Sequence, residues 1–285
     1  MTLDSSSQLI HQIGNMMLPF LYDRTVVVID TKDKPQSQKD RWSIFSGTVV
    51  DFGERLLFAT ASHCIDNFEN PTRFMLMSHD GRFDAVDASV IRRTIAMDND
   101  RPDVGILELD RSRFQSAYSH SVSTIDNIVV DCPDEYPATV MGAPSEEVKV
   151  FENGIRGILA GFTTAGLRQD AWPKINVTNP FDAAIDIIAR YPNDNDTIRD
   201  EKGLRSTLPD PHGLSGGGYW VHRLDTSGIW HPGVSQLAAI QSSWQQKHEY
   251  IRLTKIEHWL RLVYSHYPEL RDTIACAFPE TFRPQ

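Results

Sequence analysis

Cysteine is scarce in this chain of 285 residues, which has only Cys64, Cys132 and Cys276. An odd number at such wide spacings matches neither a disulfide scaffold nor a zinc-ligand pattern, so we expect no metal and no other cofactor. The first fifteen residues lack the basic start and continuous apolar stretch of a secretory signal. No apolar run approaches the length that spans a bilayer. These absences predict a cytoplasmic protein that does not bind a membrane.

Positive charge is also in short supply. The chain has 28 Lys and Arg against 38 Asp and Glu, which gives a formal net charge of -10. Phosphate backbones and anionic membrane surfaces attract basic patches, so nucleic acid is not expected as a partner. The hydrophobic content of 40% is enough to bury a sizeable core in one large domain or two small ones.

Short apolar or alternating runs fill most of the chain and predict strands. One series extends from Arg24 to about Leu109 and includes TVVVID, LLFATA and VGILEL. A second series includes ATVMGAP, AIDIIARY and QLAAIQSSW. Gly, Asp and Asn turns separate these runs. Two sets of about six short strands predict two β-barrels or sandwiches.

Two amphipathic stretches predict helices near the ends of the chain. Apolar residues from Ser5 to Phe20 form one helical stripe, and we favour a helix packed on the protein body over one that docks a partner. A C-terminal helix is expected after Thr254 and Glu257, which are spaced as a capping box. The polar stretch of residues 192–207 has almost no apolar content and predicts a solvated loop.

Three segments carry the residue types that acyl transfer by a serine requires: a base, an acid that orients it, and backbone donors for the oxyanion. His63 follows the strand LLFAT, Asp103 precedes the strand GILEL, and Ser215 lies among glycines in PHGLSGGGYWV. Taken singly, the three residues have ordinary explanations: His63 as a buried histidine, Asp103 as a turn residue and Ser215 as a spacer among glycines. Together and in this order they predict a catalytic triad, with the amides of Gly213 and Ser215 as the oxyanion hole.

These segments resemble the motifs of the trypsin-like serine protease family. The family's T-A-x-H-C box reads here as residues 60–64, its D-x-A-x-x-x-L box as 103–109 with Gly105 for the small residue, and its G-x-S-G-G box as 213–217. The order His, Asp, Ser is the order of this family. The resemblance implies an all-β chymotrypsin fold of two six-stranded antiparallel β-barrels with the site between them. It also implies a serine endopeptidase that works through an acyl-enzyme intermediate.

The resemblance divides the chain into four parts. Residues 1–22 form an N-terminal helical extension, 23–125 the first barrel with His63 and Asp103, 126–250 the second barrel with Ser215, and 251–285 a C-terminal helix and tail. It covers the chain from about Thr25 to Leu260.

Two departures from the family are visible in the sequence. Leu214 occupies the position where the digestive branch has an aspartate that pairs with a cleaved N-terminus, so the zymogen switch is absent and compact bacterial members are closer. No cysteine precedes Cys64, so the disulfide that the family makes to the strand near Ser46 is absent as well. Cys64 is therefore expected to be a buried free thiol.

The resemblance also implies where a protein or peptide substrate binds. Its backbone would pair with the strand that carries the Ser243-Trp244 dipeptide. Pro209 at the pocket floor favours a small or medium apolar residue before the scissile bond, whereas its neighbour Asp210 would favour Arg or Lys. The expected substrate-binding residues are Pro209, Asp210, His212, Ser242, Ser243 and Trp244.

Two other functions stay open at this point. A catalytically silent pseudoprotease would use the same fold as a protein-binding module, and an esterase would use the same triad. The intact triad argues against the first, and the substrate strand, which suits an extended peptide, argues against the second. A cytosolic protease must avoid general digestion, so by analogy with bacterial relatives we expect limited cleavage in a regulatory or defence role. A regulatory protein partner is left open.

Overall fold

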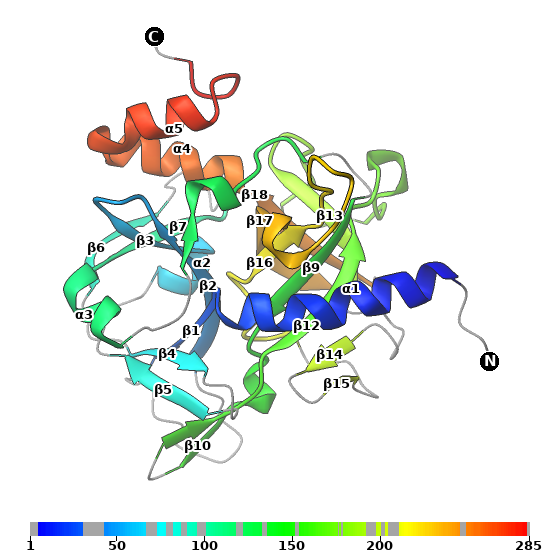
Figure 1. The fold of residues 1–285 in the computed structure, drawn as a ribbon, viewed down its shortest axis with the longest axis horizontal. Coiled ribbons are helices and arrows are strands. Elements are labelled where there is room, and N and C mark those ends of the chain that lie inside the picture. Colours follow the sequence, from blue (N-terminus) through cyan, green and yellow to red (C-terminus); the bar gives the residue numbers. More distant parts are fainter. Residues whose placement is uncertain are drawn as a thin grey trace.

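A computed structural model describes residues 5–30, 43–66, 73–77, 82–86, 90–95, 101–117, 122–132, 136–151, 154–175, 177, 179–191, 198–200, 203–204, 211–245 and 249–283. These residues form a mostly β fold with two sheets and a few helices (Figure 1). Neighbouring strands are antiparallel, except for one short parallel pair between β2 and β8.

The first sheet has ten strands within the described residues, in the order β10-β11-β5-β4-β1-β2-β3-β7-β6, with β8 beside β2. The strands are β1 (Thr25–Asp30), β2 (Ser43–Asp51), β3 (Leu56–Thr60), β4 (Arg73–Met77), β5 (Arg82–Val86), β6 (Val90–Ile95), β7 (Gly105–Leu109), β8 (Ser123–Thr124), β10 (Lys149–Phe151) and β11 (Gly154–Arg156). The expected domain bounds put the β10–β11 hairpin with the second half of the chain, but it pairs with β5 in this sheet.

The second sheet has eight strands in the described part of the chain, in the order β13-β18-β17-β16-β9-β12-β14-β15. The strands are β9 (Pro137–Gly142), β12 (Ala160–Ala165), β13 (Asp186–Arg190), β14 (Ile198–Asp200), β15 (Gly203–Leu204), β16 (Gly218–Val221), β17 (Gln236–Gln245) and β18 (Tyr250–Lys255). A bridge between Gly166 and Ala189 and a hydrogen bond from Leu167 N to Ile188 O (2.6 Å) bring the end of β12 back to β13. The sheet is therefore strongly curled.

The described chain has five α-helices, and α1, α4 and α5 lie near its ends. They are α1 (Ser5–Tyr22), α2 (Ser62–Ile65), α3 (Arg111–Ala117), α4 (Ile256–His266) and α5 (Arg271–Ala277), with short 3-10 turns η1 (Ile125–Asn127), η2 (Ser145–Glu147), η3 (Gln169–Ala171), η5 (Pro232–Val234) and η7 (Pro268–Leu270). Helix α1 lies against β12 and β9 of the second sheet, and α4 contacts β17 and β7 (Figure 1). Both expected terminal helices are confirmed.

The strands are apolar on both faces because each face packs into a different core. Val26 and Val28 of β1 join a cluster inside the first sheet, whereas Val27 between them joins a central cluster. In the second sheet Tyr219 of β16 joins a cluster internal to that sheet, and its neighbour Trp220 joins the central one. Side chains alternate along a strand, so a continuous apolar run is required where both faces are buried.

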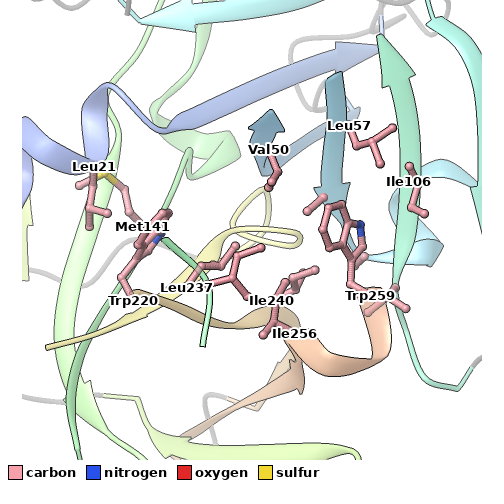
Figure 2. Close-up of a cluster of buried hydrophobic side chains, with 14 of the residues drawn as sticks. Leu21, Val50, Leu57, Ile106, Met141, Trp220, Leu237, Ile240, Ile256 and Trp259 are labelled. Carbon is pink, nitrogen blue, oxygen red and sulfur yellow. The ribbon is translucent and has the colours of Figure 1, made fainter. Parts of the chain in front are cut away.

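The central cluster contains residues from both sheets and from α1 and α4. Figure 2 shows Leu21 of α1 and Trp220 of β16 at one end and Trp259 of α4 near Leu57 at the other. Trp220 and Trp259 are fully buried. At about 25 cal/mol per Å² of apolar surface, large buried aromatic side chains are among the main stabilising contributions of such a cluster.

Two local expectations are wrong. Strands β14 and β15 form a hairpin within residues 192–207, and Ile198 pairs with Phe162, so part of this stretch extends the second sheet and is not a solvated loop. Strand β14 in this way supplies backbone hydrogen-bond partners to β12. The capping box of Thr254 and Glu257 does not form, because Thr254 lies in β18, Lys255 is the N-cap of α4, and no side chain caps this helix.

Candidate active site

Strand pairing brings His63 and Asp103 together. Thr60 at the end of β3 pairs with Gly105 at the start of β7, so the residues just after β3 and just before β7 meet at one edge of the first sheet. His63 lies there on the short helix α2, and its Nδ1 is 2.7 Å from Oδ2 of Asp103. The side chain of His63 is 48% exposed and that of Asp103 only 19%. The carboxylate is thus the more sheltered partner, which suits an orienting group.

Asp103 is held by three hydrogen bonds. Its Oδ1 accepts the hydroxyl of Ser62 (2.7 Å) and the backbone amide of His63 (3.1 Å), while Oδ2 faces the imidazole. Burial alone would raise the pKa of Asp103, but the bonds from His63 and Ser62 outweigh it and lower the pKa. The carboxylate therefore stays ionised near neutral pH. Its position directs the proton of neutral His63 to Nδ1 and leaves Nε2 free to accept one.

The free nitrogen of His63 lies beside a thiol. Nε2 is 3.6 Å from Sγ of Cys64. Desolvation alone would lower the pKa of His63, but the hydrogen bond to Asp103, followed by the hydrogen bond and charge of Cys64 and the charge of Asp103, raises it above its ordinary value. Burial raises the pKa of Cys64, so its thiol is neutral at neutral pH.

Ser215 lies on a loop that is bonded to both sheets. The amide of Ser46 in β2 donates to the Ser215 carbonyl (2.8 Å), and the amide of Gly216 donates to Gln241 O in β17 (2.8 Å). The loop packs against the end of β3, because a Cβ on Gly216 would meet Oγ1 of Thr60, three residues before His63, at 2.1 Å. Within the described part of the chain, however, no hydrogen bond joins Ser215 Oγ to His63 Nε2.

Two backbone amides of this loop have no acceptor in the described part of the chain. Among the described residues, neither Gly213 N nor Ser215 N makes a hydrogen bond. Gly213 has φ +93° and Gly216 has φ +85°, in the left-handed region that side chains disfavour. Paired free amides on such a turn are suited to bind an anion or a developing oxyanion.

The expected substrate residues are brought together only in part. The His212 ring contacts the Trp244 ring edge-to-face at 5.6 Å, and Ser243 of β17 is exposed. Ser242 is buried and its hydroxyl donates to Arg252 O (3.1 Å), yet it lines the same cavity as His63 and Ser243. The other two, Pro209 and Asp210, lie outside the described residues.

A polar cavity of about 370 Å³ adjoins the His-Asp pair. Its lining includes His63, Asp103, Ser243, Arg101, Arg252 and Asp186. Asp186 is buried and pairs with both Arg101 and Arg252, whose NH2 lies 2.7 Å from Asp186 Oδ2. Because Arg101 is two residues from Asp103, these ion pairs tie the segment of Asp103 to β13 and β18 of the second sheet.

Three further features concern metal ligands, membrane-spanning helices and thiols. The described residues contain no group of three or more His, Cys, Asp and Glu that could hold a metal ion. None of their helices is both long and apolar enough to cross a membrane. All three cysteines are free thiols. Cys64 is only partly buried, contrary to the expectation of a buried thiol, and it lies beside the half-exposed imidazole of His63.

Sequence reasoning missed Ser62, Ser46 and the Asp186 ion pairs. Ser62 had a signal, since it directly precedes His63, but serine next to histidine is too common to single out. Ser46 and Asp186 bond to residues far away in the sequence, and no local sequence signal marked either of them.

No protein-family model matches the chain, and no curated protein matches it either.

Proposed function

We propose that this chain is a serine endopeptidase of the trypsin-like class, with His63, Asp103 and Ser215 as its triad. The observation that carries the proposal is the 2.7 Å contact from His63 Nδ1 to Asp103 Oδ2, together with a serine loop in which two amides have no acceptor among the described residues. Two mostly antiparallel sheets, the second of them curled, and a serine loop bonded to both support a chymotrypsin-like arrangement of two barrels over about residues 23–125 and 126–250.

In the proposed reaction, Ser215 Oγ attacks the carbonyl carbon of the scissile peptide and His63 Nε2 takes its proton. The amides of Gly213 and Ser215 bind the resulting oxyanion, and His63 returns the proton to the leaving amine. Water then attacks the acyl-enzyme by the same route and frees Ser215. Asp103 keeps the imidazole in the tautomer that these steps need.

The free enzyme must adjust one contact before it reacts. His63 Nε2 is next to Cys64 Sγ, so Nε2 has to exchange this neighbour for Ser215 Oγ when substrate binds. Catalytic hydrogen bonds are often long or poorly aligned in the absence of substrate. The half-exposed imidazole has room for this change.

The setting of the enzyme is part of the proposal. The three free cysteines favour a reducing compartment such as the cytosol, and the absence of an acid at Leu214 favours an enzyme that is active without cleavage. We propose limited cleavage of partner proteins, with a small or medium apolar residue before the scissile bond and a basic residue as the second choice.

A peptide library incubated with the purified chain tests the proposal. The wild type and Ser227→Ala, a change at an exposed serine remote from the loop, should cleave library peptides equally, and Ser215→Ala should not. Loss of turnover by roughly a millionfold is expected when such a nucleophile is removed. A folded wild-type chain that cleaves no peptide or ester would indicate a pseudoprotease, and turnover of esters alone would indicate an esterase.

A further inference from the structure

Ser46 of β2 directs all of its polar groups to the candidate active site. Its side chain is fully buried. Its hydroxyl donates to Gly213 O (2.8 Å) and accepts the amide of Ala143 (3.0 Å). Its own amide donates to Ser215 O (2.8 Å), and its carbonyl accepts the hydroxyl of Thr60 (2.9 Å). One residue of the first sheet therefore holds two carbonyls of the serine loop and also bonds the end of β3, three residues before His63.

The loop carbonyls are held one after another. Leu214 N donates to Pro211 O, Ser145 N to His212 O, and Gly217 N to Leu214 O, at 2.7 to 3.0 Å. Ser46 supplies the bonds to the two carbonyls that remain between residues 211 and 215. Of these five bonds, only the one to Gly213 O comes from a side chain.

A held carbonyl fixes the amide of the same peptide unit, because the unit is planar. The bond to His212 O orients the amide of Gly213, and the bond to Leu214 O orients the amide of Ser215. The peptide between these two units carries Gly213 O and Leu214 N, so the hydroxyl of Ser46, together with the bond from Leu214 N to Pro211 O, sets their relative orientation. A glycine with positive φ has many accessible conformations and cannot hold this peptide by itself.

Packing around Ser46 leaves little room for an alternative. A Cβ on Gly142 would meet Ser46 Oγ at 2.8 Å, and a Cβ on Gly213 would meet Ala143 O at 2.3 Å. Without the hydroxyl, Gly213 O and Ala143 N would be buried without that partner, and an unsatisfied buried group favours rearrangement. One such rearrangement is rotation of the peptide between Gly213 and Leu214, about ψ of Gly213 and φ of Leu214, which would also break the bond from Leu214 N to Pro211 O.

We propose that Ser46 is a positioning residue that aligns the amides of Gly213 and Ser215 to bind the oxyanion. This inference rests on the proposed function, because the two amides matter only if an oxyanion forms there. Ser46 itself touches no reacting atom.

Ser46→Ala tests the inference, with Ser235→Ala as the matched control. Ser235 is also fully buried, and its hydroxyl lies 3.0 Å from His222 Nδ1, so both variants lose a buried hydroxyl and should lose thermal stability. Removal of one oxyanion donor costs about a hundred- to a thousandfold in kcat, and misalignment should cost about ten- to a hundredfold. We expect that loss for Ser46→Ala, with KM within about twofold, and unchanged kcat for Ser235→Ala.

A transition-state probe separates positioning from simple destabilisation. A peptide boronate built on the best-cleaved library sequence forms a tetrahedral adduct, and its inhibition constant should rise for Ser46→Ala by the factor by which kcat/KM falls. Ser46→Thr keeps the hydroxyl and should retain kcat within about threefold even if its Tm falls. This variant decides the matter if Ser46→Ala does not fold.

Two results would overturn the inference in different ways. If wild type cleaves peptides and folded Ser46→Ala does so with the same kcat and the same boronate affinity, Ser46 has no positioning role while the proposed function stands. Equal loss of kcat in Ser46→Thr and Ser46→Ala would also exclude a positioning role for the hydroxyl. If the wild type itself neither cleaves peptides nor binds the boronate, the proposed function fails and the inference fails with it.

Discussion

His63 Nδ1 and Asp103 Oδ2 lie 2.7 Å apart although 40 residues separate them in the chain. The antiparallel register of β3 and β7 brings them together, and the hydroxyl of Ser62 holds the second oxygen of the carboxylate. This contact sets the tautomer of the imidazole. It is also the element of the proposed mechanism that a conservative substitution tests most easily.

Asp103→Asn should lower kcat about ten-thousandfold without unfolding the protein. An amide in place of the carboxylate favours the tautomer that carries the proton on Nε2, which cannot accept the proton of Ser215. The measurement is peptide turnover by the folded variant. Asp170→Asn is the matched control, because Asp170 is 73% exposed and its one ion pair within the described residues is with Arg168 at 3.4 Å. Activity of Asp103→Asn within tenfold of wild type would contradict the assigned role.

The acid limb of kcat/KM should have its midpoint above pH 6.5. His63 accepts a proton only when neutral, and its bond to Asp103 raises its pKa above the ordinary value of 6.5, so activity falls as the pH drops through the raised pKa. In Asp103→Asn the carboxylate that raises the pKa of His63 is gone, while desolvation still lowers this pKa. The midpoint of the acid limb should therefore move to lower pH. Proton NMR of the His63 ring gives the same pKa independently. A wild-type midpoint at or below 6.5 would disagree with the contact.

Gly216→Ala should lower the free energy of unfolding by roughly 3 kcal/mol or more. Its Cβ would meet Ser46 O at 2.0 Å, and positive φ adds about 1–2 kcal/mol to overpacking costs of about 1–3 kcal/mol. Gly53 has a similar φ of +83° with nothing within 4 Å of its Cβ, so Gly53→Ala should cost only about 1–2 kcal/mol. Urea denaturation measures both, and equal losses would mean that the loop does not pack on β2 as described.

Helix α1 should stabilise the protein and should not inhibit it. Met17 is fully buried, whereas its neighbour Met16 is 51% exposed, and Phe20 contacts Trp220 edge-to-face at 5.7 Å. Met17→Ala should cost about 2–5 kcal/mol of unfolding free energy, and Met16→Ala should stay within about 0.5 kcal/mol. Turnover of the folded variants in excess dithiothreitol should match wild type. A gain in activity for Met17→Ala would indicate an inhibitory helix.

Much of the fold follows from hydrophobic patterns that single strands and helices carry. Val27 and Val28 are both apolar because each side of β1 faces a core, and Met17 falls on a helical stripe. The three-residue strands β10 and β11 are too short for such a pattern, so their place beside β5 could not be predicted. Thr254 looked like a cap, but pairing with Ile240 keeps it in β18.

The candidate site also has residues that the sequence predicts and residues that it does not. His63, Asp103 and Ser215 belong to local motifs and could be predicted together. Ser46 bonds to Gly213 across 167 residues, and a single serine in an apolar strand carries no sign of such a partner. The pairing of Asp186 with Arg252 likewise depends on the register of β13 and β18. Tertiary contacts of this kind have no periodic signal in the sequence.

Covalent labelling of Ser215 by a fluorophosphonate tests the central claim most directly. The purified wild-type chain is treated with the reagent, digested, and the modified residue identified by mass spectrometry. The account predicts one adduct, on Ser215, that is absent in Ser215→Ala and strongly reduced in His63→Ala, because the hydroxyl needs the imidazole as its base. No adduct on a folded wild-type chain, or equal labelling of Ser215 in His63→Ala, would contradict it.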